Sequence, residues 1–548
     1  MTASAGSAVF FVAALLAICA FVLLLLRHYL PLRPTPAYLL LPVFLALALP
    51  ASIILLVPID LATVFTQDDT AGSPKGIWLP PRVVLVAWRI TYWLTFALTW
   101  IILPLVGEYV DAGHRSPRSR FMYALNANLR YQAIVLGLAI AAGVYVFLTS
   151  GVSFASLKAL VMALAYAWGL VLAIALMGHG LVALPREMFK QASTSGRLRR
   201  AQARAPRVHE KLLDAEDELA EVEDQVRVLS GRKRGTALDF QDWIDELAEG
   251  AGVHEAPSAA ARGTTNTTAP AVITERYLAE LTRRLHRAKH KRARFADEWE
   301  CLVDMAVEAQ AILDAAGSQR LEFSPRPDNS SLKGSHPLSW QSYVSKTWRK
   351  ASKAWLTPRT RYYLHANILP SISVFVAILA AVASVFLVET EMLRPFSVQQ
   401  GALIPLTVRM FAPRTEAFDF SKQFVSAFWL CYAVACTLYS VSFVRVWRGR
   451  ALVRRGTHPE SAAWYAALAA RLAVPLAYHV GSMLTQSDGA WDRTVFHDFL
   501  GRMIDFTPLG EGFSRWFPVF VLVPMMRTTR TEGRAMHLGL AGGEKVEA

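Results

Sequence analysis

The sequence SAVFFVAALLAICAFVLLLL, residues 7–26, decides the class of fold to which this chain belongs. It holds no charged residue, and a helix of about 20 residues spans roughly 30 Å, the thickness of the hydrocarbon core of a bilayer. The rest of the chain agrees, because 53% of its 548 residues are hydrophobic and its mean hydropathy is +0.30. We therefore expect an all-α protein that crosses a lipid bilayer several times.

Further apolar runs predict the remaining spans. With 7–26 they lie at 38–58, 83–106, 131–149, 158–179, 366–388, 424–444 and 462–484. A ninth run, 513–526, is short and reaches full length only if Arg515 and Trp516 lie at the interface. The sequence thus predicts about nine transmembrane helices in a polytopic helical membrane protein.

The spans divide the chain into four parts. These are an N-terminal membrane domain with five spans (1–185), a polar central loop (186–365), a C-terminal membrane domain with four spans (366–526) and a polar tail (527–548).

The distribution of Lys and Arg predicts the orientation. Seven basic residues lie between Arg186 and Arg207 and six between Lys346 and Arg361, whereas the connection 150–157 has none. Cytosolic loops carry the excess of positive charge, so we expect the central loop and the tail in the cytosol and the N-terminus outside or in a lumen. The plasma membrane and an endosomal or vacuolar membrane both remain open. The basic loops fit an anionic inner leaflet, and we expect no nucleic-acid partner.

The central loop contains two heptad seams, which predict a cytosolic coiled-coil hairpin at 206–231 and 274–316. The second seam runs for about 58 Å at 1.5 Å per residue, which suits a rod projecting from the membrane. Whether the helices pair within one chain or between two is open. The candidate core positions are Leu212, Leu219, Val226, Leu281, Leu285, Phe295, Trp299 and Leu302.

The sequence LDFQDWIDEL, 238–247, lies between the two seams and has one apolar helical face formed by Phe240, Trp243, Ile244 and Leu247. This face is either a docking motif for a protein partner or the part that closes the tip of the hairpin. We favour the second interpretation.

The sequence lacks the short motifs of catalysis. It has no phosphate-binding loop, no His-Glu-x-x-His, no Cys-x-x-Cys and no Gly-x-Ser-x-Gly. Glu108, Asp111 and His114 would share a helical face, but Arg115 and Arg118 beside them favour a solvated, salt-bridged helix end over a metal site. We expect no enzymatic activity, no cofactor and no metal.

The eighth predicted span contains RLAVPLAYHV, residues 471–480, and with it a candidate intramembrane polar site formed by Arg471, Pro475 and His479. A charge in a membrane costs about 3 kcal/mol on insertion scales and persists only with a partner inside the bundle. Pro475 removes the N–H that would bond the Arg471 carbonyl. A structural cluster, a ligand or transport site and a pH switch are all open, and the structural cluster is favoured.

Four segments resemble the limb-region membrane protein family, which includes the lipocalin-interacting membrane receptors. They are LPLVGEYVDAG (103–113), GHGLVALPRE (178–187), RLAVPLAYHV (471–480) and TPLGEGFSRWFP (507–518). Among its branches, the chain is most similar to the limb-region domain-containing protein 2 group. Relatives tend to have Cys in place of Ala470 and Ala477, and Asn in place of His479, so hydrogen bonding and not titration is implied at His479.

The resemblance implies a multi-pass membrane receptor or a receptor-associated signalling or trafficking adaptor. Its protein partners, possibly including a membrane receptor, would bind at the coiled coil. A secondary transporter of a small molecule or vitamin, with a midplane site around Arg471 and His479, is the alternative. We favour the adaptor, because transporters rarely need a cytosolic insertion with a long heptad seam.

Overall fold

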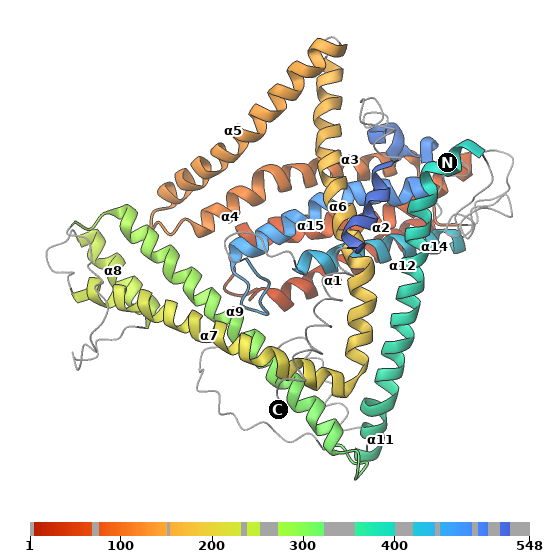
Figure 1. The fold of residues 1–548 in the computed structure, drawn as a ribbon. Helices are drawn as coiled ribbons and strands as arrows, with labels where there is room; N and C mark the ends of the chain where they lie inside the picture. Colours follow the sequence, from red (N-terminus) through yellow and green to blue (C-terminus); the bar gives the residue numbers. More distant parts are fainter. Residues whose placement is uncertain are drawn as a thin grey trace.

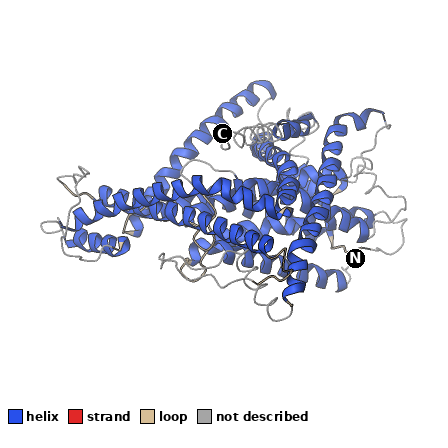
Figure 2. Cartoon of the chain, turned by 60° about the horizontal axis from the view of Figure 1, so that its bottom comes forward, coloured by secondary structure: helices blue, strands red, loops and turns tan. Residues whose placement is uncertain are grey.

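The computed structural model describes residues 5–67, 76–150, 154–231, 238–252, 272–322, 357–400, 420–443, 450–484, 491–501 and 516–526. All regular structure in these segments is helical, as Figure 2 shows. The predicted all-α class is therefore confirmed.

The N-terminal half forms seven of these helices. They are α1 (Ala5–Tyr29), α2 (Ala37–Gln67), α3 (Pro81–Ala97), a π-helix η1 (Leu98–Ile102), α4 (Leu103–Asp111), α5 (Pro117–Ser150) and α6 (Phe154–Ala192). The C-terminal half contains α11 (Pro358–Tyr363), a π-helix η2 (Leu364–Ile368), α12 (Leu369–Gln400), α14 (Phe420–Phe443), α15 (Pro459–Leu484), and the short turns η4 (Trp491–Arg493), η5 (His497–Gly501) and η6 (Phe517–Val521).

Proline marks the start of several helices. The helices α3, α5, α11 and α15 begin at Pro81, Pro117, Pro358 and Pro459. The first turn of a helix has no intrahelical acceptor for its N–H groups, so the N–H that proline lacks is not missed there, and its fixed φ already suits the helix. These starts are local properties of the sequence.

Six helical segments of the described chain are long and apolar enough to cross a membrane. They are Ala5–Tyr29, Ala37–Val64, Pro81–Asp111, Trp168–Ala192, Pro358–Leu393 and Phe420–Ser442. The predicted spans 131–149 and 462–484 lie within α5 and α15, which are not among the six, and only residues 516–526 of the predicted ninth span are described. The chain is a multi-pass membrane protein by these criteria, and the count of nine spans stays a prediction.

The helix α15 lies at the centre of the bundle. It packs against α2, α4, α6 and α14 (Figure 1), and most of its side chains are buried. By contrast α1 packs mainly on α2 and leaves most of its apolar side chains exposed, as a helix facing lipid would. The central position explains how α15 keeps polar residues, because they face other helices and not hydrocarbon.

The sequence GHG, 178–180, brings α6 close to two neighbouring segments. A Cβ on Gly180 would lie 2.0 Å from the carbonyl oxygen of Cys436 on α14, and one on Gly178 would lie 2.6 Å from that of Val521. His179 between them bonds Ser440 through Nδ1, at 3.0 Å. The segment therefore forms a helix-packing contact in which small residues allow backbones to approach.

The polar central loop forms three described helices, α7 (Thr194–Gly231), α8 (Leu238–Ala251) and α9 (Glu275–Asp314). The helices α7 and α9 pack against each other along most of their length. Of the candidate core residues, Trp299 is partly buried and the others are at most 8% exposed, namely Leu212, Leu219, Val226, Leu281, Leu285, Phe295 and Leu302. The heptad positions thus form the contact between two helices of one chain.

The helix α8 closes the tip of this helical hairpin. Trp243, Ile244 and Leu247 are buried in one cluster with residues of α7 and α9, and Phe240 packs against it. These side chains are therefore occupied within the chain, as the favoured interpretation expects.

The hairpin does not project freely from the bundle, as a free rod would. It lies across the ends of the membrane helices (Figure 1), where α9 contacts residues 111–123 and 454–458. The helix lengths were predictable, but ion pairs with the bundle set the angle of the hairpin.

Candidate functional site

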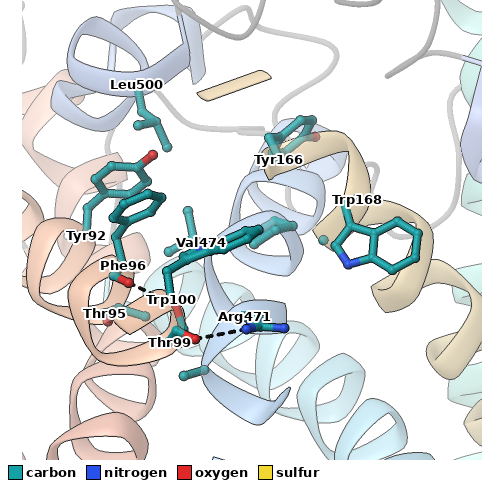
Figure 3. Close-up of a pocket in the computed structure, with 13 residues that line it drawn as sticks. Tyr92, Thr95, Phe96, Thr99, Trp100, Tyr166, Trp168, Arg471, Val474 and Leu500 are labelled. Atoms are coloured by element: carbon teal, nitrogen blue, oxygen red, sulfur yellow. Dashed lines mark hydrogen bonds between the residues drawn. The ribbon is translucent and has the colours of Figure 1, made fainter. Parts of the chain in front are cut away.

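Arg471 on α15 reaches into the π-helix η1. Its Nη2 donates a hydrogen bond to the carbonyl oxygen of Thr99 at 2.9 Å, and its guanidinium lies 5.0 Å from the centre of the Trp100 ring (Figure 3). The Nε atom is buried and makes no hydrogen bond within the described residues. A cation over an aromatic face is stabilised by the quadrupole of the ring. The charge thus has partners, and those found among the described residues include no carboxylate.

Pro104 explains why a carbonyl is available for Arg471. In η1 the N–H of Leu103 bonds the carbonyl of Leu98, so the next acceptor, Thr99, would need an N–H from Pro104, which has none. The Trp100 carbonyl has lost its ordinary donor for the same reason and accepts instead from Gln132 Nε2 at 2.8 Å. One proline therefore frees two carbonyls, and two other helices supply side-chain donors.

Arg471 and Pro475 line an aromatic pocket of about 70 Å³. Its walls come from α3, η1, α6, α15 and η5, as Figure 3 shows. Helix α6 can approach here because it has glycine at 169: a Cβ would lie 2.6 Å from Pro475 Cγ and 3.3 Å from the Arg471 carbonyl oxygen. The aromatic members of the lining are Tyr92, Phe96, Trp100, Tyr166 and Trp168.

His479 has a different partner, the carboxylate of Glu391 on α12. Its Nε2 lies 2.6 Å from Glu391 Oε1, and both side chains are 1% exposed. The second carboxylate oxygen, Oε2, is buried and makes no hydrogen bond to the described residues. Removing one partner of such a buried hydrogen-bonded pair is costly, because it leaves a polar group in a dry environment.

The predicted site is therefore two sites. Arg471 and Pro475 share the aromatic pocket, whereas His479 turns to α12 and does not line it. Glu391 was not among the predicted site residues, because the predicted span ended at residue 388, three residues before it.

A second residue missed from the sequence is Asp60, the only charged residue of α2. It is fully buried and accepts hydrogen bonds from Trp88 Nε1 at 3.0 Å, from the N–H of Val495 at 3.0 Å and from the N–H of Phe496 at 2.9 Å. These bonds join α2, α3 and the segment after α15. An isolated acid in an apolar helix was the available signal, and the predicted span stopped at residue 58, just before it.

The fold does not keep together the three candidate ligand residues Glu108, Asp111 and His114. The helix α4 ends at Asp111, so His114 is not on the same helical face and instead lies 3.2 Å from Glu275 on α9. Asp111 has a side chain only 2% exposed and binds Arg287 of α9 through both oxygens, at 2.5 and 3.3 Å. The expectation of a salt bridge is confirmed, but that of a solvated helix end is wrong for Asp111, because α9 covers it.

Gly113 sets how closely α9 approaches. Its φ is +68°, in the left-handed region that favours glycine, and a Cβ there would lie 2.3 Å from the carbonyl oxygen of Ala279. Beside it, Arg283 of α9 bonds the hydroxyl of Tyr123 on α5. We call Asp111, Gly113, His114 and their α9 partners the hairpin junction.

The exposed edge of α7 is acidic. Residues Glu210, Asp214, Asp217, Glu221 and Asp224 are all exposed there. Two further acids pair across to α9: Glu218 contacts Lys291, and Glu216 lies 3.4 Å from Arg292. The hairpin thus presents negative charge away from its basic partner helix.

Comparison with known proteins gives a family. A family model described as "LMBR1-like membrane protein" matches residues 7–531. The chain is 21% identical to "G-protein coupled receptor-associated protein LMBRD2" of Gallus gallus, over 82% of this chain and 64% of the relative. It is 27% identical to "LMBR1 domain-containing protein 2 homolog A" of Dictyostelium discoideum, over 80% of this chain and 56% of the relative.

A Caenorhabditis briggsae protein with the same name as the Gallus gallus relative is 27% identical over 36% of this chain and 35% of the relative. The matches therefore span between about a third and two-thirds of the length of these relatives. No solved structure matches the chain.

Proposed function

The chain belongs to the family of LMBR1-like membrane proteins, and from that premise we propose that it is a receptor-associated adaptor that recruits its partner through the α7–α9 hairpin. Two of the similar proteins have names that associate them with G-protein-coupled receptors. In this proposal the hairpin faces the cytosol from the plasma membrane or from an endosomal or vacuolar membrane, and the protein catalyses no reaction.

The observation that carries the proposal is the fixed position of the hairpin. Arg287 and Arg283 of α9 bind the ends of α4 and α5, and α9 also lies against the segment before α15. A rod held at several points displays its outer edge at a constant place beside the membrane helices. A neighbouring membrane protein would meet that edge without an ordering cost for the hairpin.

The charge of the edge indicates the chemistry of the partner. The exposed acids of α7 would attract a basic segment, such as the Lys- and Arg-rich cytosolic loop that the positive-inside bias gives most membrane receptors. Such pairs at the rim of an interface raise the association rate more than the affinity, and the effect weakens as salt screens them.

Proximity labelling in cells tests this function. A labelling enzyme is inserted between residues 255 and 271, and the protein is co-expressed with a G-protein-coupled receptor and an unrelated multi-pass protein of equal abundance. We expect several-fold stronger labelling of the receptor. Equal labelling of the two proteins would contradict receptor association.

A charge-reversed variant identifies the surface. Glu210→Lys with Asp214→Lys and Glu221→Lys alters only exposed positions of α7, so the fold is expected to survive. Receptor labelling is expected to fall to the level of the unrelated protein. The matched control, Arg276→Glu with Arg284→Glu, changes charge on α9 and should retain most of the labelling.

The buried pair of His479 and Glu391 favours a second candidate, a proton-coupled secondary transporter, because ionisable groups inside a membrane bundle often form proton relays. His479→Asn keeps a hydrogen-bonding group of similar size and loses the ability to bind a proton. In reconstituted vesicles, a transporter would lose pH-driven uptake in this variant while remaining folded. An adaptor would keep its abundance and its receptor labelling.

A further inference from the structure

Three ligand-type side chains from distant parts of the chain meet at the hairpin junction. They are Asp111 at the end of α4, His458 just before α15 and Glu460 in its first turn, and their ligand atoms all lie within 4.8 Å of one another. Nearly 350 residues separate Asp111 from the other two. This cluster is distinct from the sites inside the membrane helices, and binding of a ligand to it does not depend on the proposed adaptor function.

The two carboxylates are unusually close for buried groups. The Asp111 side chain is 2% exposed and that of Glu460 is 7% exposed. Two buried negative charges repel each other unless cations lie between or beside them. Arg287 of α9 pairs with Asp111 at 2.5 Å, and Arg450 pairs with Glu460 at 2.7 Å.

His458 supplies a ring nitrogen to the cluster. Its ligand atom lies within 4.8 Å of a carboxylate oxygen of Asp111 and of one of Glu460. A neutral imidazole is the commonest metal ligand in proteins, and one nitrogen beside two carboxylates is a mixed donor set.

His290 of α9 lies beside the cluster. Its ring lies 5.5 Å from that of His458, centre to centre, and its Nε2 is buried without a hydrogen bond to any described residue. A buried imidazole nitrogen that lacks a partner costs free energy, and a water bound to the ion would supply that partner.

We propose that Asp111, His458 and Glu460 bind a divalent transition-metal ion of the Zn²⁺ type, with water as the fourth ligand. Three imidazole and carboxylate ligands with a water at the fourth position are typical of zinc, whereas calcium and magnesium take oxygen alone. The ion would join the end of α4 to the start of α15, beside α9. Arg287 is 39% exposed and has water to move into when the ion takes its place beside Asp111.

The competing explanation is a network of ion pairs that needs no metal, in which Arg287 and Arg450 are sufficient. The two explanations differ in the role of Arg287. As a competitor for Asp111 it weakens metal binding, whereas in a metal-free network it is simply a structural partner.

Metal binding is measured on the full-length protein in detergent, after treatment with a chelator, by calorimetric titration with Zn²⁺ and by the visible absorption of Co²⁺. We expect one ion per chain and the intense absorption of a tetrahedral Co²⁺ site. His458→Ala should weaken binding at least about tenfold. His365→Ala is the matched control, because His365 also lies beside an acid, Glu308 at 4.0 Å, but far from the cluster.

Arg287→Gln provides the second variant. It leaves every proposed ligand in place and removes the competing charge, so tighter Zn²⁺ binding than in the wild type is expected. Unchanged or weaker binding in Arg287→Gln would overturn the proposal, as would full Zn²⁺ binding by His458→Ala or the absence of a stoichiometric ion in the wild type. Receptor labelling is not part of this measurement, so the proposal stands or fails separately from the adaptor function.

Discussion

Asp60 and Glu391 lie among the membrane helices, whereas Asp111 lies where the hairpin meets them, and these carboxylates have different kinds of partners. Asp60 is held by three N–H groups of rigid backbone and indole, and Glu391 by a single buried imidazole. Asp111 is held by Arg287, a flexible side chain that is 39% exposed. The contacts of Asp60 and Glu391 are buried, whereas the contact of Asp111 is partly exposed to water through Arg287.

This difference separates structural contacts from adjustable ones. A donor that loses its partner in the membrane bundle has no water to replace that partner. The substitution therefore costs the full desolvation free energy of the donor. At the hairpin junction Arg287 is 39% exposed, so water reaches the arginine side of the contact, and a substitution of Arg287 that keeps a donor to the buried Asp111 costs less. We therefore expect changes in the bundle to lower abundance, and changes at the junction to alter the position of the hairpin.

The largest expected effect is the unfolding of the hairpin while the membrane bundle remains folded. Leu281 and Leu285 are 2% and 1% exposed in the cluster at the tip of the hairpin. Leu281→Asp with Leu285→Asp should destabilise the hairpin by about 5 kcal/mol or more, because apolar burial is lost and charge is buried. Limited proteolysis should cut the hairpin rapidly, and receptor labelling should be lost, while membrane extraction shows normal insertion.

The control for that variant is Leu213→Asp on α7, where the native side chain is 47% exposed. It should resist proteolysis as the wild type does. If the double variant failed to insert, the two regions would fold as one unit and the contrast between them would be wrong.

Asp60→Ala tests the most closed contact. It strands the Trp88 indole N–H and the N–H groups of Val495 and Phe496, with an expected cost of about 4 kcal/mol. Thermal unfolding in detergent should show a clear decrease in the melting temperature. Asp60→Asn keeps one acceptor, so its melting temperature should lie between those of the wild type and Asp60→Ala. A wild-type melting temperature for Asp60→Ala would show that these hydrogen bonds do not stabilise the bundle.

The pair of Glu391 and His479 is tested by a double-mutant cycle. His479→Leu leaves a buried carboxylate without its partner and should cost about 3 kcal/mol. Adding Glu391→Leu removes the stranded charge, so the double variant should be more stable than His479→Leu alone. Additive losses of stability in the melting curves would mean that the two side chains do not interact.

Gly180→Ala probes backbone packing within the same bundle, without any charge. The new Cβ would lie 2.0 Å from the Cys436 carbonyl oxygen, so α6 and α14 must separate, at a cost of about 2 kcal/mol. Gly137→Ala on α5 is the matched control, because a Cβ there meets nothing within 4 Å. Equal melting temperatures for the two variants would show that α6 and α14 are not in close contact.

The smallest expected effect is at the junction. Arg287→Gln removes the charge of a partly exposed side chain but keeps an amide that can donate to the buried Asp111, so it should change the stability of the bundle by only about 1 kcal/mol. Hydrogen exchange should nevertheless become faster in the α9 segment beside it when no metal is present. A large loss of global stability would show that the contact of Asp111 with Arg287 stabilises the bundle as the buried contacts of Asp60 do.

The sequence predicted the hairpin and its core well because heptad spacing is local information. Leu219 and Leu285 lie on the apolar stripes of their own helices. Two such stripes joined by one connection bury each other when the helices pack side by side. The apolar faces of α1 and α2 were likewise evident from composition. The ends of the spans were less well defined by hydropathy. The predicted spans stop at residues 58 and 388, just before Asp60 and Glu391.

The same kind of pattern was misleading at Glu108, Asp111 and His114. A spacing of three residues suggested one helical face, but α4 ends at Asp111 and the chain turns at Gly113, so His114 belongs to another contact. Asp111 joins His458 and Glu460 instead. No local signal connects residues so far apart in the chain.

The sequence by itself determined that this protein is helical, lies in a membrane and has a pair of long polar helices, because each property depends on hydropathy and period within one segment. Only the tertiary structure decided that Arg471 bonds Thr99, that His479 meets Glu391 and that Arg287 covers Asp111. A helix's own pattern shows which face is buried, but the partner on that face depends on how whole helices pack, and this is a property of the assembled bundle.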